Sequence, residues 1–169
     1  IKNAIFESYM EKCHKYTVAG HSFGIILPDE AEAAALLGNY QPLAAEEEHN
    51  LCFVLTLSYT EDLQKNRSGE LKGCFNDEAP YFWLFEEAEG RYNFGFSYTK
   101  SRPDCILKPS EDYSDNVVYI PRQYASRLLE FALSNSMMLL YTFNTSPYDT
   151  LMIHASVIAY EGKGYVFLG

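Results

Sequence analysis

The chain has 169 residues, of which 47% are hydrophobic and 15% aromatic, and this composition excludes a disordered protein because it supplies a substantial core. The formal net charge of −10 disfavours binding to a nucleic-acid backbone, which would repel an acidic protein. No apolar run reaches the roughly 18 to 20 residues that cross a membrane, and the first residues lack the apolar segment of a signal peptide. We therefore expect a cytoplasmic protein that binds neither nucleic acid nor membrane.

The early part of the chain predicts a strand and then a short helix. "HSFGII" is apolar enough for a strand, Asp29 is a suitable helix N-cap after Pro28, and Gly38 is a suitable stop after the alanine-rich run. "LCFVLTLSY", residues 51–59, is the next strand. The polar residues that follow it, 61–77, predict turns and loops, and the "NRS" sequon at Asn66 has no secretory signal to support it.

Residues 81–98 predict an aromatic β-hairpin, because "YFWLFEE" and "YNFGFSY" flank a short glycine-containing connection. Two further short strands follow, "CILKP" and "NVVYIP", so the region predicts an antiparallel meander. The hairpin's aromatic residues favour the core of a small sheet, and a ligand-stacking platform is the alternative. The residues in question are Trp83, Phe85, Phe94 and Phe96.

One long helix is predicted from Pro121 to Tyr141, because this segment lacks interior glycine and proline and spaces its apolar residues by three and four. Pro147 ends the helical region by disfavouring helical geometry at Ser146. The residues expected to face the sheet are Leu128, Leu129, Ala132, Leu133, Met137 and Leu140.

No metal site is predicted. The four cysteines are irregularly spaced, which favours reduced structural thiols over disulfides or a zinc ribbon. His49 and Cys52 form an H-x-x-C pair that Cys13 and His14 could complete only if the fold brought them together. The acidic stretch "AEEEHN" favours a solvated loop over a cation site because it lacks interleaved aspartates.

The C-terminal residues predict a second hairpin. "MIHASVIAY" alternates two faces, "EGKG" provides the turn, and "YVFLG" is apolar throughout, as in a strand covered on both faces of an α/β sheet.

This segment, "LMIHASVIAYEGKGYVFLG", resembles the residues just before the nucleotide-binding loop in the HPr kinase/phosphatase family and its bacterial serine-kinase relatives. Those proteins are in turn similar to phosphoenolpyruvate carboxykinases. By this resemblance Gly169 matches the first glycine of the P-loop motif G-x-x-x-x-G-K-[ST]. The resemblance therefore implies that Gly169 is a cofactor-binding residue. His154 takes the place of the family's histidine near the nucleotide phosphates, which implies an accessory catalytic role.

The resemblance implies an α+β chain with two parts. Residues 1–120 are expected to form an antiparallel β-rich accessory domain, and residues 121–169 the helix and hairpin that start an α/β domain like that of HPr kinase and phosphoenolpyruvate carboxykinase. The parent protein would use ATP and Mg²⁺ to phosphorylate a hydroxyl of a protein or peptide substrate. Residues 1–169 would form the N-terminal portion of that parent protein. On their own they would be inactive and would have no cofactor. Residues 165–168 would be an exposed strand able to self-associate.

A second hypothesis is a complete non-catalytic module that binds a peptide or partner through its aromatic sheet. It is favoured by the lack of any catalytic-triad signature around Ser22, His21 or His154.

Overall fold

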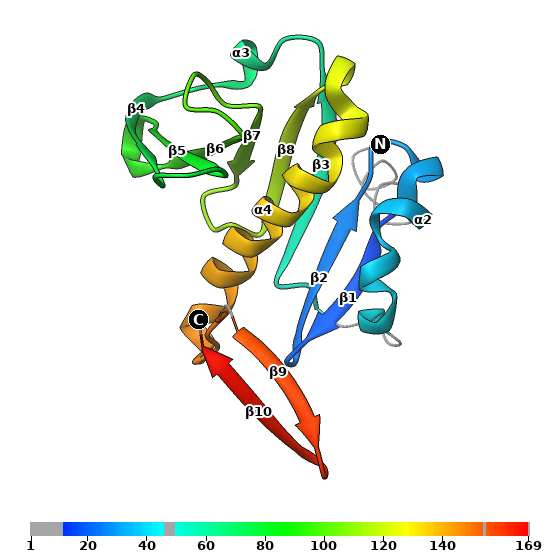
Figure 1. The fold of residues 1–169 in the computed structure, drawn as a ribbon. Helices are drawn as coiled ribbons and strands as arrows, with labels where there is room; N and C mark the ends of the chain where they lie inside the picture. Colours follow the sequence, from blue (N-terminus) through cyan, green and yellow to red (C-terminus); the bar gives the residue numbers. More distant parts are fainter. Residues whose placement is uncertain (1–11, 46–49, 154, 169) are drawn as a thin grey trace.

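An eight-stranded mixed sheet and one long helix form the body of the protein, and a two-stranded hairpin leaves it near the C-terminus (Figure 1). This computed structural model describes residues 12–45, 50–153 and 155–168. The predicted combination of a β-rich region, a long helix and a C-terminal hairpin is confirmed. The predicted division at residue 120 stays a prediction.

The first two strands, β1 (His14–Val18) and β2 (His21–Ile26), form an antiparallel pair. The turn between them uses two positive φ angles, +48° at Ala19 and +82° at Gly20, which suit a tight hairpin. After β2 the chain forms three short helical segments, η1 (Glu30–Glu32), α2 (Ala33–Leu36) and η2 (Gly38–Leu43). Asp29 caps the first of them as predicted, since its Oδ1 accepts a hydrogen bond from the N–H of Ala31 at 2.9 Å.

The remaining strands of the large sheet are β3 (Phe53–Thr60), β4 (Glu70–Phe75), β5 (Tyr81–Glu86), β6 (Tyr92–Ser97), β7 (Cys105–Pro109) and β8 (Asp115–Pro121). Their order is β1-β2-β3-β8-β7-β6-β5-β4. The run from β4 to β8 is antiparallel, which confirms the predicted meander. The expectation of a wholly antiparallel region is wrong, because β3 is parallel to both β2 and β8. Long connections make this possible, since residues 27–52 and 61–114 carry the chain back before each parallel strand begins.

Two strands of the large sheet were not predicted from the sequence. β1 and β4 are the edges of the large sheet, and their sequences HKYTV and ELKGCF mix charged and apolar residues. A strand that pairs on one side only needs less apolar patterning, so the hydrophobic signal is weak there. The turn α3 (Leu63–Asn66) and β4 therefore occupy a segment that was predicted as loop.

The long helix α4 runs from Ala125 to Thr145, between the single turns η4 (Arg122–Tyr124) and η5 (Ser146–Tyr148). The predicted start at Pro121 is wrong because this proline ends β8, with ψ at 121°. The helix also continues past Tyr141 by one turn. All six residues predicted to face the sheet are buried.

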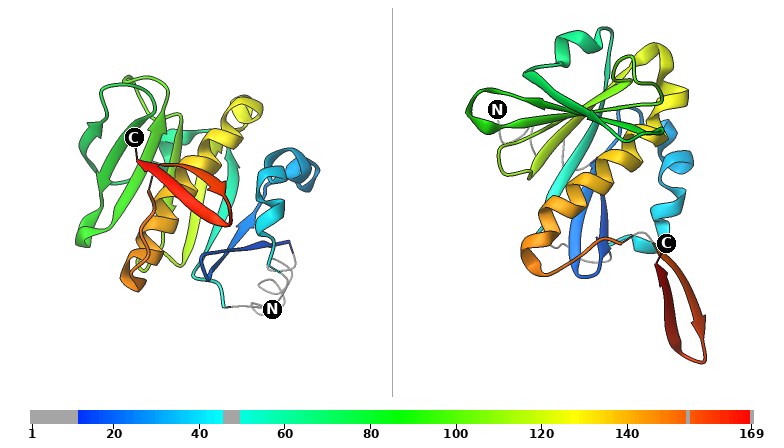
Figure 2. Two further views of the ribbon diagram at one scale, coloured as in Figure 1. Left: turned by 60° about the horizontal axis from the view of Figure 1, so that its bottom comes forward. Right: turned by 60° about the vertical axis from the view of Figure 1, so that its left-hand side comes forward.

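Helix α4 crosses one face of the sheet over its parallel strands (Figures 1 and 2). It packs on β3, β8 and β7, where the fully buried residues include Leu55, Leu57, Val118 and Ile120. The α3 segment contacts β7 and β8 as well. The body is thus organised around β3 and β8. Among the described residues, no helix is long and apolar enough to cross a membrane.

We expect Leu133→Ala in α4 to lower the free energy of unfolding by about 2–5 kcal/mol, because Leu133 is buried and its loss leaves a cavity. Met138→Ala is the matched control on the exposed side of the same helix and should cost about 0.5 kcal/mol. Urea denaturation measures both. Equal losses for the two variants would contradict the assigned buried face.

Candidate functional site

The C-terminal hairpin is the segment on which the sequence places a function. It consists of β9 (Ala155–Tyr160) and β10 (Lys163–Leu168), paired only with each other. Glu161 and Gly162 form the turn with φ angles of +49° and +72°. Two consecutive positive φ angles are the geometry of a tight hairpin turn, and the glycine suits it.

Exposed apolar side chains lie on both faces of the hairpin. Ile158 and Tyr165 are opposite each other on one face and are 57% and 46% exposed, and Val166, on the other face, is 53% exposed. Figure 2 shows that the hairpin projects away from the sheet and helix α4. An isolated two-stranded hairpin is only marginally stable in water, and packing against further structure is what usually stabilises one.

The two residues that the resemblance singles out, His154 and Gly169, lie outside the described residues. Their roles as an accessory catalytic histidine and as the first glycine of a P-loop therefore stay predictions. Tyr165 and Val166 are exposed as expected for the predicted edge strand.

The aromatic residues of β5 and β6 are mainly core, as favoured from the sequence. Trp83, Phe85 and Phe96 are buried, and the indole N–H of Trp83 donates to Ser97 Oγ at 2.8 Å. Phe94 is half-buried and packs on Phe143 of α4, with ring centroids 5.7 Å apart. These four side chains consequently do not form an exposed stacking platform.

A different aromatic row reaches the surface beside α4. Phe75, Phe82 and Phe96 follow one another across β4, β5 and β6 in register. Burial decreases along the row, from Phe96 at 0% exposed to Phe75 at 52%. The sequence signal for this row is weak because Phe75 lies in the unpredicted edge strand.

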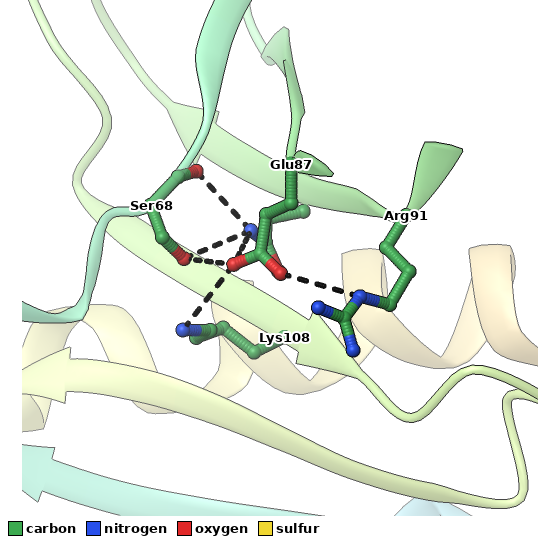
Figure 3. A network of polar contacts seen from close by, with 5 residues as sticks. Ser68, Glu87, Arg91 and Lys108 are labelled. Atoms are coloured by element: carbon green, nitrogen blue, oxygen red, sulfur yellow. Dashed lines mark hydrogen bonds and ion pairs between the residues drawn. The ribbon is translucent and has the colours of Figure 1, made fainter. Parts of the chain in front are cut away.

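A polar network joins the β5–β6 turn to its neighbours around Glu87 (Figure 3). The Glu87 carboxylate accepts hydrogen bonds from the Ser68 hydroxyl and from Asn93 Nδ2, the latter at 3.0 Å. Lys108 Nζ and Arg91 Nε are each 3.7 Å from a carboxylate oxygen. The hydrogen bonds from Ser68 and Asn93 lower the pKa of Glu87 first of all, with the nearby cations adding to the effect.

This network has a structural role. A carboxylate with two hydrogen-bond donors and two cations stays ionised, so it has no proton to donate at neutral pH. Asn93 is buried and also donates to the backbone oxygen of Ser68 at 3.2 Å, which ties β6 to the segment before β4. Ser68 is thus engaged in this network.

The possible metal ligands are not assembled. His14 Nε2 is 2.9 Å from Glu30 Oε2, and Cys13 is partly buried next to Gly24. His49 and residues 46–48 lie outside the described residues. Among the residues that the structure describes, no group of three or more His, Cys, Asp or Glu side chains could hold a metal ion.

The imidazole of His21 contacts a hydroxyl, but not that of Ser22. Its Nε2 is 2.8 Å from Thr150 Oγ1, whereas Ser22 Oγ is bonded to Thr17 Oγ1 at 2.8 Å. The rings nearest to the imidazole belong to Tyr141 and Tyr148. No carboxylate is recorded as orienting His21 within the described part of the chain, so the Thr150–His21 pair lacks the third member of a triad.

An apolar groove of about 280 Å³ lies between α4, the β1–β2 pair and η2. Its walls include Phe23, Tyr40, Met137 and Tyr141, and Met152 closes one side. The side-chain polar groups of its lining residues are the hydroxyls of Tyr40, Ser134 and Tyr141, and that of Tyr141 donates to the backbone oxygen of Val18 at 2.9 Å.

Comparison with known proteins gives no further guide, since no family model, curated protein or solved structure matches this chain.

We expect Glu87→Gln to lower the free energy of unfolding at pH 7 by about 1 kcal/mol, because the amide keeps an acceptor for Ser68 but loses the charge that faces Lys108. A lowered folded pKa contributes stability above the ordinary glutamate pKa of about 4.3, and this stability is lost as the pH falls through the folded pKa. The difference between wild type and variant should therefore shrink in acid.

Urea denaturation at pH 7 and at low pH measures this difference, with the exposed Glu111→Gln as control. If the difference in the free energy of unfolding between wild type and Glu87→Gln does not change with pH, the Glu87 charge contributes nothing to stability.

Proposed function

We propose that the β9–β10 hairpin belongs to a P-loop nucleotide-binding unit of a serine-kinase-like protein that transfers phosphate from ATP to a hydroxyl of a protein or peptide. One observation carries the proposal: the hairpin exposes apolar residues on both faces and pairs with no strand of the large sheet. The likeness of residues 151–169 to the HPr kinase/phosphatase family gives the proposal its chemistry.

Exposure on both faces favours an α/β unit over a second antiparallel layer. Strands of α/β sheets are covered by helices on both sides and are therefore apolar throughout, whereas antiparallel layers usually keep one polar face. Ile158 on one face and Val166 on the other fit the first pattern. The P-loop is a strand, a glycine-rich turn and a helix in succession, so an apolar strand is its required first part.

The proposed unit would work mainly by holding phosphates. Backbone N–H groups of the glycine-rich turn and the positive end of the following helix bind the phosphate oxygens, a lysine reaches the β and γ phosphates, and a Ser/Thr hydroxyl holds Mg²⁺. In this proposal Gly169 begins that turn and His154 lies beside the transferred phosphate. Catalysis would come from positioning and charge stabilisation, with the eight-stranded sheet as an accessory unit.

The proposal predicts that the coding sequence after the Gly169 codon encodes a glycine-rich stretch ending in Gly-Lys-Ser or Gly-Lys-Thr. A protein that includes this stretch should gain about 2.7 kcal/mol of stability with ATP and Mg²⁺ at 100 times the dissociation constant. Residues 1–169 alone should gain none. A thermal-shift titration measures both proteins.

Replacing the lysine of that stretch by alanine is the control, because it removes the phosphate contact and leaves the hairpin intact. The proposal is wrong if the coding sequence lacks the stretch, or if residues 1–169 respond to ATP as strongly as the longer protein.

Half-exposed aromatic side chains at the sheet edge and on α4 favour a second candidate, a module that binds a peptide partner. Phe75 at the sheet edge and Phe143 on α4 are 52% and 37% exposed, and aromatic side chains of this kind are enriched at protein interfaces. Absence of the glycine-rich stretch would leave this candidate as the better one.

A further inference from the structure

The segment between α4 and β9 is held against the body at one point. We call residues 149–153 the exit strap, because they carry the chain from η5 to the hairpin. The strap begins with a sharp turn, since Asp149 has a left-handed φ of +57°. Leu151 and Ile153 are 78% and 51% exposed, so most of the strap gains little from burial.

His21 provides the point of attachment. Its Nε2 is 2.8 Å from Thr150 Oγ1, and its ring lies edge-on to Tyr141 and tilted against Tyr148, with centroids 6.2 Å and 5.8 Å away. The Thr150 hydroxyl itself donates to the backbone oxygen of Tyr148 at 3.3 Å. With the hydroxyl donating to Tyr148, Thr150 Oγ1 is free to accept a hydrogen bond from the Nε2–H tautomer of His21.

The attachment also determines what lies over the apolar groove. Met152 follows Thr150 by two residues and forms one wall of the groove, opposite Met137 and Tyr141. Tyr141 contributes to both features, because its ring contacts His21 and its hydroxyl donates to the backbone oxygen of Val18 at the end of β1. The Tyr141 side chain therefore takes part both in the attachment at His21 and in the groove.

We propose that the exit strap is a latched lid: the His21–Thr150 hydrogen bond holds Met152 over the apolar groove and sets the direction in which the hairpin leaves the body. His21 is a positioning residue in this device. Breaking the latch releases the strap, opens the groove at Met152 and frees the hairpin to swing about Asp149. The proposal rests on contacts among residues 18–153 only, so it stands whether or not the hairpin belongs to a nucleotide-binding unit.

Methyl NMR of the methionines in the intact chain tests the latch. Met152 lines the groove together with Phe23, Tyr40 and Tyr141, so its methyl group should have a ring-current-shifted resonance, which moves toward the random-coil position when the strap is released. We expect this movement in Thr150→Val and in His21→Ala. The Met137 resonance, which reports on the floor of the groove, should stay in place in Thr150→Val.

Chymotrypsin provides a second readout, because Tyr148 and Leu151 flank the latch and are exposed. Loss of one hydrogen bond should raise the cleavage rate at these residues roughly fivefold, in proportion to the open population. His21→Gln, which can restore a donor to Thr150, should recover part of the wild-type rate. A role of the ring in packing alone would not be rescued in this way.

Thr142→Val is the matched control, since its hydroxyl donates to the backbone oxygen of Met138 on α4, away from the strap. The proposal is overturned if the Met152 resonance and the cleavage rate are unchanged in Thr150→Val, or if Thr142→Val changes them equally. It is also overturned if Thr150→Val shifts Met137 as much as Met152, because His21 and Thr150 would then stabilise the whole body rather than the strap.

Discussion

The packing of α4 on the parallel strands β3 and β8 is the contact on which the rest of the structure depends. Side chains such as Leu57 and Ile120 are almost fully removed from water beneath the helix, and burial of this kind is the main favourable term in folding. The β1–β2 pair extends the sheet from one side of this centre and the antiparallel run β7 to β4 from the other. Because the exit strap and hairpin follow α4 directly, the position of the helix on the sheet also determines where they begin.

The Glu87 network helps to hold the outer strands of the large sheet together, as apolar packing holds its centre together. The Glu87 carboxylate in the β5–β6 turn accepts a hydrogen bond from Ser68 before β4 and faces Lys108 of β7. A charged group with several partners is costly to leave unpaired, so the network favours one arrangement of these segments. It also holds the scaffold of the aromatic row that ends at Phe75.

The sequence predicts this fold well where one local pattern decides the outcome. The spacing of Leu129, Leu133 and Leu140 identifies the buried face of α4, and the alternation around Trp83 identifies a core strand. Prediction from the sequence fails where contacts between residues far apart in the chain determine the structure. The edge strands β1 and β4 exist because neighbouring strands offer hydrogen bonds, and Pro121 ends a strand because β3 pairs with it. The partner of His21 is 129 residues away at Thr150, so no local pattern could reveal the latch.

The edges of the two sheets differ in how they are protected. In the large sheet β4 has a bulge between Leu71 and Gly73 and a charged Lys72, while the backbone of Ala45 binds that of Lys15 beside β1. Bulges, charges and covering segments of this kind prevent edge-to-edge association. The hairpin strands lack such protection, since Lys163 is their one charged residue and they contain no proline. The hairpin strands therefore keep apolar side chains exposed on both faces and carry little of the edge protection that the large sheet has.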